Sequence, residues 1–240
     1  MSADLRFPIQ TSELTDLQHG LDRIVGDKLR GALGSSQPLI VHMLGIPGAG
    51  KTVFAQPLFE CLNRRLADTL TYVGFDQLMS DIPLYKSSRD PVSAFTAFEL
   101  PARAAGYALL KGLLDKRASI LFDHGGASPD HVEILRYAIN RLGYSAFMVH
   151  VKCSADEATK RINRRAEIEG RHTPAHYVED RQNIIDDLTP RYLKLLHGFA
   201  MLDNSEERAV DRDQLVANLA EVILCCTVDA TRQNEKLRQR

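Results

Sequence analysis

The sequence has no excess of charge of either sign, because its 240 residues contain 30 Lys plus Arg against 31 Asp plus Glu and carry a formal net charge of −1. A protein dedicated to nucleic-acid binding usually needs surplus positive charge to neutralise a run of phosphates. The balance argues against that class, although it leaves nucleic acid open as the substrate of a small site. Apolar residues at 44% and charged residues at 25% argue against disorder and are typical of a globular protein.

Long apolar runs are also missing. The first ten residues include Asp4 and Arg6 and have no apolar stretch that ends in small residues, so no secretory signal is predicted. The most apolar segment, 216–228, is interrupted by Asn218 and Glu221 and is far shorter than the roughly 20 residues that a bilayer span requires. These absences predict a cytoplasmic protein that makes no membrane contact.

Closely spaced cysteine pairs are absent as well. No C-x-x-C pattern occurs among the four cysteines, which lie at positions 61, 153, 225 and 226. Cys225 and Cys226 are adjacent within an apolar helical pattern. We therefore predict reduced cysteines that serve in packing.

Short apolar runs alternate with helical periodicity along most of the chain. The runs predicted as buried strands are 38–44, 70–75, 119–122, 146–153 and 199–202. Such alternation, without repeats or low-complexity linkers, is typical of right-handed βαβ units around one parallel sheet. We expect an α/β fold in a single domain over 1–240, with an N-terminal helix at 11–34, a core at 38–205 and a C-terminal helical segment and tail at 206–240.

Proline, glycine and small polar residues predict where the elements begin and end. Residues 77–91 contain two prolines and are predicted as an exposed functional loop. The helical pattern over 92–116 is expected to break or kink at Pro101. Helix starts are predicted at Ser128–Pro129, Ser154, Thr173–Pro174 and Thr189–Pro190, and a helix end at Gly143.

The most specific signal is a glycine-rich stretch between the first predicted strand and a predicted helix. Residues 45–52, GIPGAGKT, match the complete pattern G-x-x-x-x-G-K-[S/T] in the context that confirms such a match. Glycines let backbone N–H groups curl around a phosphate, and the helix adds its positive N-terminal end. The stretch predicts a nucleoside triphosphate site, with ATP as the expected ligand, built from Gly45, Ile46, Pro47, Gly48, Ala49, Gly50, Lys51 and Thr52.

Two side chains of this stretch and one later carboxylate have expected chemical roles. Lys51 supplies a positive charge that can reach the β- and γ-phosphates, and the Thr52 hydroxyl can ligate a bridging Mg²⁺. Asp123 follows an apolar strand, as does the carboxylate that holds Mg²⁺ through water or orients an acceptor in such proteins. A loop-capping role beside Gly125 and Gly126 is the alternative for Asp123.

Asp76 is the candidate for proton transfer. It lies at the predicted C-terminal end of a strand, and strand ends border the ligand crevice in an open α/β sheet. A carboxylate there can accept a proton from an attacking hydroxyl. A solvated acid that caps the next turn is the alternative.

Four arginines gather around a turn, where guanidinium groups can neutralise charge on a transferring phosphoryl group. They are Arg161, Arg164, Arg165 and Arg171, and some of them are expected to be surface charges. Arg171 is the preferred candidate, because a lid could deliver it once substrate is bound.

A phosphate site alone does not separate a kinase from a motor or a switch. The sequence has neither the N-K-x-D pattern that reads guanine nor the L-S-G-G-Q pattern of ABC-type ATPases. These absences favour a kinase. A nucleotide-dependent switch that regulates a partner without phosphorylating anything is the alternative from a different class.

Five segments in a fixed order point further: GIPGAGKT at 45–52, GFDQLMSDIP at 74–83, SILFD at 119–123, RHTP at 171–174 and LDNS at 202–205. In this order they resemble the zeta-toxin family of bacterial kinases, within the larger group of P-loop small-molecule kinases. The resemblance implies five parallel strands with helices on both faces. It also implies ATP-dependent phosphorylation of a sugar hydroxyl, which in known members belongs to UDP-N-acetylglucosamine.

The resemblance also assigns site residues. Asp76 would activate the acceptor hydroxyl, Lys51 and Arg171 would stabilise phosphate charge, and Arg165 would be a second arginine. The acidic position after the third strand falls on Asp123, and Asn204 would border the adenine site. The sequence therefore predicts an ATP- and Mg²⁺-dependent kinase of a small-molecule hydroxyl, with an antitoxin-like inhibitor protein as a further candidate partner. An antibiotic, another metabolite or a polynucleotide end is the alternative acceptor.

Overall fold

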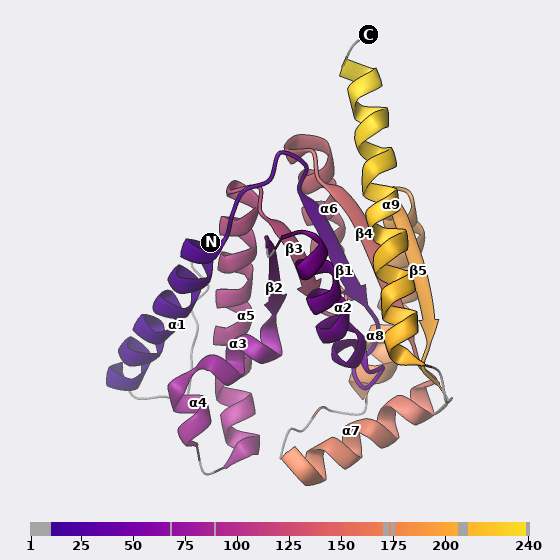
Figure 1. Cartoon of the computed structure of the whole chain (residues 1–240). Helices are drawn as coiled ribbons and strands as arrows, with labels where there is room; N and C mark the ends of the chain where they lie inside the picture. The colour runs from indigo at the N-terminus through magenta and orange to yellow at the C-terminus, as the bar shows by residue number, and fades with distance from the viewer. Residues whose placement is uncertain are drawn as a thin grey trace.

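A sheet of five parallel strands forms the centre of the computed structural model, which describes residues 11–67, 69–88, 90–169, 173, 176–205 and 211–238 (Figure 1). The strand order is β2-β3-β1-β4-β5. The strands are β1 (Leu39–Leu44), β2 (Leu70–Gly74), β3 (Ser119–Asp123), β4 (Ser145–Lys152) and β5 (Gly198–Asp203). All four neighbouring pairs are parallel, so the predicted fold class is confirmed.

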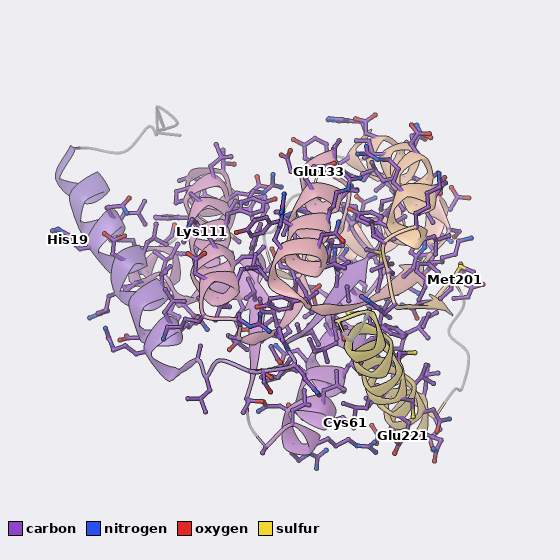
Figure 2. The ribbon with its side chains drawn as sticks, turned by 90° about the horizontal axis from the view of Figure 1, so that it is seen from above. His19, Cys61, Lys111, Glu133, Met201 and Glu221 are labelled. Carbon is purple, nitrogen blue, oxygen red and sulfur yellow. The ribbon has the colours of Figure 1, made fainter. Side chains whose placement is uncertain are left out.

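Helices cover both faces of this sheet. They are α1 (Thr11–Gly31), α2 (Lys51–Arg65), α3 (Phe75–Asp81), α4 (Pro83–Ser87), α5 (Pro91–Asp115), α6 (Pro129–Leu142), α7 (Ala155–Glu169), α8 (His176–Leu193) and α9 (Arg212–Arg238). Figure 2 shows α2 with Cys61 and α9 with Glu221 on one side of the sheet, and α5 with Lys111 and α6 with Glu133 on the other. Within the described ranges, no helix has the length and apolar character needed to cross a bilayer.

The two-sided cover explains the apolar composition of the central strands. All six residues of β1 are buried, and β4 is buried over 146–151. A strand with helices on both faces has no solvent side, so apolar residues continue along it instead of alternating with polar ones.

Local signals for helix ends are confirmed. The Ser128 hydroxyl accepts a hydrogen bond from the backbone N–H of Asp130, and α6 ends at Gly143 in the left-handed region with φ 70°. The Ser154 hydroxyl likewise accepts from the N–H of Glu157 at 3.2 Å, ahead of α7. These caps satisfy backbone groups that have no partner inside the helix.

The prediction of an exposed loop over 77–91 is wrong, because α3 and α4 occupy most of that segment. Leu78, Met79 and Ile82 are buried. Leu78 packs in the main apolar core, and Met79 and Ile82 pack in a second apolar cluster with side chains of α1 and α5. Pro83 stands at the start of α4, where its missing N–H costs no helical hydrogen bond. Helix formation here depends on packing partners from elsewhere in the chain.

The prolines predicted to interrupt two helices do not interrupt them. The helix α5 continues through Pro101, and α8 continues through Pro190 to Leu193. The break at Pro101 and the restart at Thr189–Pro190 are therefore wrong, and the alternative of a kink at Pro101 stays a prediction. The Thr189 hydroxyl instead donates to the carbonyl of Ile185 at 2.7 Å. Packing of these long helices outweighs one missing backbone bond. The start predicted at Thr173–Pro174 includes Pro174, which lies outside the described residues, and α8 begins at His176.

Candidate active site

The glycine-rich loop between β1 and α2 is shaped by left-handed backbone angles. Gly48 has φ 78° and Gly50 has φ 86°, in a region where a side chain is strained. A Cβ atom on Gly50 would also lie 2.5 Å from Nδ2 of Asn204. Glycine is therefore required at these positions, where the loop passes close to Asn204 and leads into α2. We call residues 45–52 the phosphate loop.

The Lys51 ammonium group lies inside this loop. Its Nζ donates hydrogen bonds to the carbonyls of Gly45 and Ile46, each at 2.9 Å. A positive charge is thereby held at the start of α2, where backbone N–H groups have no helical partner. Both features attract an anion such as a phosphate.

Asp123 comes to the same edge of the sheet from the end of β3. The strand register places it beside Met43 of β1 and Gly74 of β2. Its Oδ2 accepts hydrogen bonds from the Thr52 hydroxyl at 3.0 Å and from the Tyr72 hydroxyl at 2.6 Å. A hydroxyl and a carboxylate next to a phosphate-binding loop are oxygen ligands of the kind that Mg²⁺ takes.

Burial and the neighbouring groups shift the pKa of the Asp123 carboxyl in opposite directions. Burial raises its pKa, whereas the Lys51 charge and the hydrogen bonds from Tyr72 and Thr52 lower it. Burial and the nearby carboxylate raise the pKa of Tyr72 far above its ordinary value, so its hydroxyl stays protonated and remains a donor.

Asp76 lies in the first turn of α3, two residues beyond the end of β2. Its side chain is exposed, and its charge raises the pKa of both Tyr72 and Asp123. The predicted candidate for proton transfer therefore stands at the same sheet edge as the other carboxylate. Its helical position, by contrast, was not predicted.

The described arginines of the predicted cluster lie on α7. Arg161 lies against the phosphate loop, because its Nη1 is 3.9 Å from the position that a Cβ on Gly50 would take. Its Nε donates to Glu157 at 2.9 Å, which orients the guanidinium group. Arg165, one turn further along, is exposed. Arg171 lies outside the described residues.

Asn204, one residue beyond the end of β5, is hydrogen-bonded to the phosphate loop. Its side-chain Nδ2 donates to the carbonyl of Ala49 at 2.8 Å, and its backbone N–H donates to Lys152 at 2.8 Å. The structure thus places Asn204 beside the loop.

Three histidines gather at the loop that follows Asp123: His42 and His131 are buried, and His124, in the loop itself, is half-buried. The ring centroid of His131 lies 5.3 Å from that of His42 and 4.7 Å from that of His124. Nε2 of His42 donates to the His124 carbonyl at 2.9 Å. Burial lowers the pKa of His42 to about 4 and that of His124 to about 3, so these rings are neutral at pH 7. Sequence reasoning missed the group, and its only local signal is a histidine inside the apolar run of β1.

Protonation of His42 should destabilise the fold in mild acid. Its pKa in the folded chain lies below the ordinary value of about 6.5, so its contribution to stability is present above that pH and is lost toward pH 4. Between pH 7 and pH 5 we expect the free energy of unfolding to fall about 2 kcal/mol less in His42→Gln than in the wild type. Urea denaturation at both pH values measures this difference.

The exposed His19 of α1 supplies the control (Figure 2). His19→Gln should keep the pH dependence of the wild type. An equal loss of stability in wild type and His42→Gln would contradict the assignment.

The loop after β3 is held by donors from three other elements. Beyond the His42 contact, Gly125 accepts from the N–H of Gly45 at 3.1 Å. Gly126 accepts from the Tyr192 hydroxyl at 2.6 Å, and Ala127 accepts from Nη1 of Arg181 at 3.1 Å. The loop that begins with Asp123 is therefore coupled to β1, to the phosphate loop and to α8.

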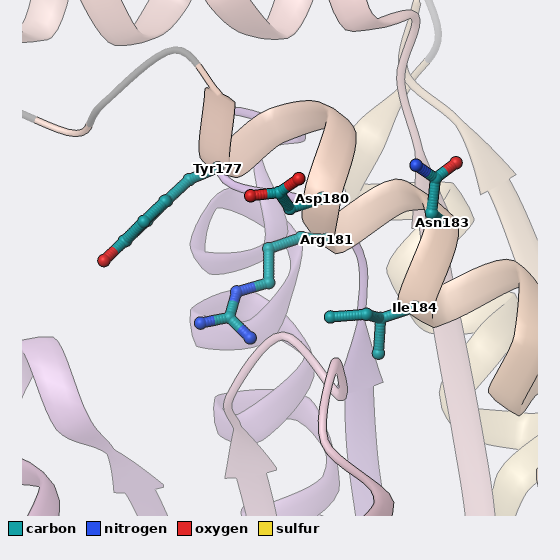
Figure 3. A pocket seen from close by; sticks show the side chains of 5 residues that line it. All are labelled: Tyr177, Asp180, Arg181, Asn183 and Ile184. Carbon is teal, nitrogen blue, oxygen red and sulfur yellow. The ribbon is translucent and has the colours of Figure 1, made fainter.

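A surface hollow of about 420 Å³ lies on α8 beside that loop. Figure 3 shows its lining side chains, with Arg181 reaching toward the loop after β3: Tyr177, Asp180, Arg181, Asn183 and Ile184. The Arg181 guanidinium lies 5.6 Å from the ring centroid of Tyr177. A cation beside an aromatic ring suits a ligand that carries an anionic group and a ring.

The family model described as zeta toxin matches residues 23–194. The chain belongs to the zeta toxin family. This confirms the resemblance to the family; the match includes the first four of the five segments, whereas LDNS at 202–205 lies beyond it. Membership of the family supports a kinase-type phosphotransferase. A comparison with curated proteins found no match for this zeta toxin family member.

Solved structures share the fold of this zeta toxin family member at low sequence identity. One is from the PezAT chromosomal toxin–antitoxin system of Streptococcus pneumoniae, with a TM-score of 0.56 and 12% identity over 90% of this chain and 96% of that chain. The AvrRxo1-ORF1:ORF2 structure with ATP has a TM-score of 0.59 and 15% identity, over 86% of this chain and 73% of that chain. A putative kinase from Chloroflexus aurantiacus has a TM-score of 0.56 and 15% identity, over 78% of this chain and 98% of that chain.

Proposed function

We propose that this protein is an ATP- and Mg²⁺-dependent kinase that transfers the γ-phosphoryl group to a hydroxyl of a small molecule. The observation that carries the proposal is that Lys51, Thr52 and Asp123 meet at one edge of the sheet. Lys51 donates to carbonyls of the phosphate loop at 2.9 Å, and Thr52 donates to Asp123 at 3.0 Å. Asp76 follows the neighbouring strand at the same edge. Phosphoryl transfer needs positioning and charge stabilisation more than covalent help from the protein.

Each residue of the site has a proposed role that follows from its chemistry. The phosphate loop and Lys51 would hold the triphosphate, while Thr52 and Asp123 would hold Mg²⁺. The bound ion would neutralise phosphate charge. Asp76 would orient the acceptor hydroxyl and take its proton, as the hydroxyl oxygen bonds to the γ-phosphorus and the bond to the departing ADP oxygen breaks.

Arginines and Asn204 complete the proposed nucleotide site. Arg161 is oriented by Glu157 beside the loop, so it can reach nucleotide phosphates. Arg165 and Arg171 stay predicted contributors of charge to the transition state. Asn204 would border the adenine from its position against Ala49.

The hollow on α8 supports a nucleotide sugar, such as UDP-N-acetylglucosamine, as the acceptor. Arg181 offers two or more donors to a phosphate, and Tyr177 offers a ring face. The structure from the PezAT toxin–antitoxin system supports an antitoxin-like inhibitor as a partner. A kinase that uses ATP would act in the cytoplasm, the location predicted from the sequence.

The helices outside the predicted core belong to the proposed kinase unit. α1 packs on α5 within the second apolar cluster, through Leu17 and Leu21. α9 packs on α2, where Arg65 and Glu221 form an ion pair at 2.5 Å. These contacts support one kinase domain over 1–240.

A mass-spectrometric screen tests the proposal. The purified protein would be incubated with ATP and Mg²⁺ against nucleotide sugars, other metabolites, hydroxyl antibiotics and polynucleotide ends, with Lys51→Ala as the blank. We expect one product heavier by a phosphoryl group and absent from the blank. Nucleotide binding without any phosphorylated product would favour the switch instead.

A further inference from the structure

The side chain of Tyr72 connects β2 to the carboxylate of Asp123. Its ring packs edge-on against Phe59 of α2, with centroids 5.5 Å apart, and its hydroxyl donates to Oδ2 of Asp123 at 2.6 Å. In the strand register, Asp123 pairs with Gly74 and not with Tyr72. The ring must therefore lean along β2 to reach the carboxylate.

Gly74 makes this lean possible. Residues two apart in a strand point to the same face, so a side chain at 74 would stand where the Tyr72 ring lies. A Cβ on Gly74 would be 2.6 Å from Cε1 of Tyr72. The glycine at the end of β2 thus has a steric role that depends on the tyrosine.

The amide of Gln56 lies close enough to the Tyr72 hydroxyl to lower the pKa of that hydroxyl. Gln56 and Thr52 are four residues apart on α2 and share one face of the helix. Thr52 donates to Asp123 directly, and Gln56 acts on the Tyr72 hydroxyl that also donates to Asp123. Both hydrogen bonds that the described residues make to the carboxylate end on the same oxygen, Oδ2.

We propose that Tyr72 is a positioning residue for Mg²⁺, which fixes the Asp123 carboxylate by its bond to Oδ2 and leaves Oδ1 to receive the ion or its water. This inference rests on the proposed function, because the ion is the one that the kinase would use. Groups that hold a metal-binding carboxylate from behind orient it, and their loss commonly lowers metal affinity by about 10-fold to 100-fold.

The test measures metal binding without an acceptor. The full-length protein would be titrated with Mn²⁺ as the probe in the presence of ADP, with free Mn²⁺ followed by electron paramagnetic resonance. Tyr72→Phe should weaken Mn²⁺ binding about 10-fold, while the affinity for ADP without metal stays within about twofold of the wild type. Gly74→Ala should shift Mn²⁺ binding in the same direction, because it displaces the ring.

Tyr144→Phe is the matched control. Tyr144 is a buried tyrosine, whereas Tyr72 is half-buried. The Tyr144 hydroxyl donates to the carbonyl of Ala118 at 2.8 Å, just before the start of β3 and so away from the sheet edge that carries Asp123. This variant loses a comparable hydrogen bond and should keep the Mn²⁺ affinity of the wild type.

Three outcomes would overturn the inference. Mn²⁺ affinity of Tyr72→Phe within about twofold of the wild type would show that the hydroxyl does not position the ligand. Equal losses in Tyr72→Phe and Tyr144→Phe would show a general structural effect. Wild-type protein that binds ADP without any effect of Mn²⁺ would contradict the proposed function itself and this inference with it.

Discussion

Lys51→Ala is expected to reduce phosphoryl transfer by about 1,000-fold or more while leaving the fold intact. The Lys51 ammonium lies within the phosphate loop, where it donates to the carbonyls of Gly45 and Ile46. Its removal takes away the charge that would balance the β- and γ-phosphates. The side chain is outside the apolar core, so thermal unfolding should change little.

Product formation from ATP, followed by mass spectrometry, measures the effect. Lys111→Ala is the matched control, because Lys111 is exposed on α5 and pairs with Asp115 at 2.6 Å (Figure 2). That variant should retain the turnover of the wild type. Full activity in Lys51→Ala would contradict the assignment of the phosphate site.

Asp76→Asn should lower transfer by about 100-fold to 10,000-fold and leave ATP binding within about twofold of the wild type. Asparagine has nearly the same shape as aspartate but cannot take a proton from the acceptor hydroxyl. Asp76 is exposed in the first turn of α3, so the change places no new polar group in the core.

Calorimetric titration with ATP and a single-turnover assay separate the two effects. Asp81→Asn is the control at the other end of α3, where Asp81 faces Lys28 of α1 at 3.7 Å. Asp81→Asn should keep transfer intact. Unchanged transfer in Asp76→Asn would remove the proton-transfer role, and a protein that binds ATP but never transfers would favour the switch.

The segment 77–91 shows how far sequence reasoning extended along the chain. Its prolines and small polar residues indicated a loop, because such residues are typical of turns. The structure forms α3 and α4 there, since Met79 and Ile82 gain apolar partners such as Leu17 and Phe98. Those partners lie 16 to 65 residues away in sequence, outside the window in which local propensity acts.

Two findings in the candidate site had no usable sequence signal. Tyr72 reaches Asp123 only because β2 and β3 are neighbours in this register. Arg161 was one of four clustered arginines and not the preferred one, and only the packing of α7 shows that it lies beside Gly50. Each depends on a contact between segments at least 50 residues apart.

The sequence by itself determined what is contiguous. The phosphate loop at 45–52, the apolar runs of the five strands and the caps at Ser128, Gly143 and Ser154 follow from neighbours within a few residues, where backbone angles and hydrogen bonds are local. Only the tertiary structure decided which side chains surround that loop. Strand order and register bring Tyr72, Asp123 and α7 together, and the gain from burying apolar residues on both faces of the sheet selects that arrangement.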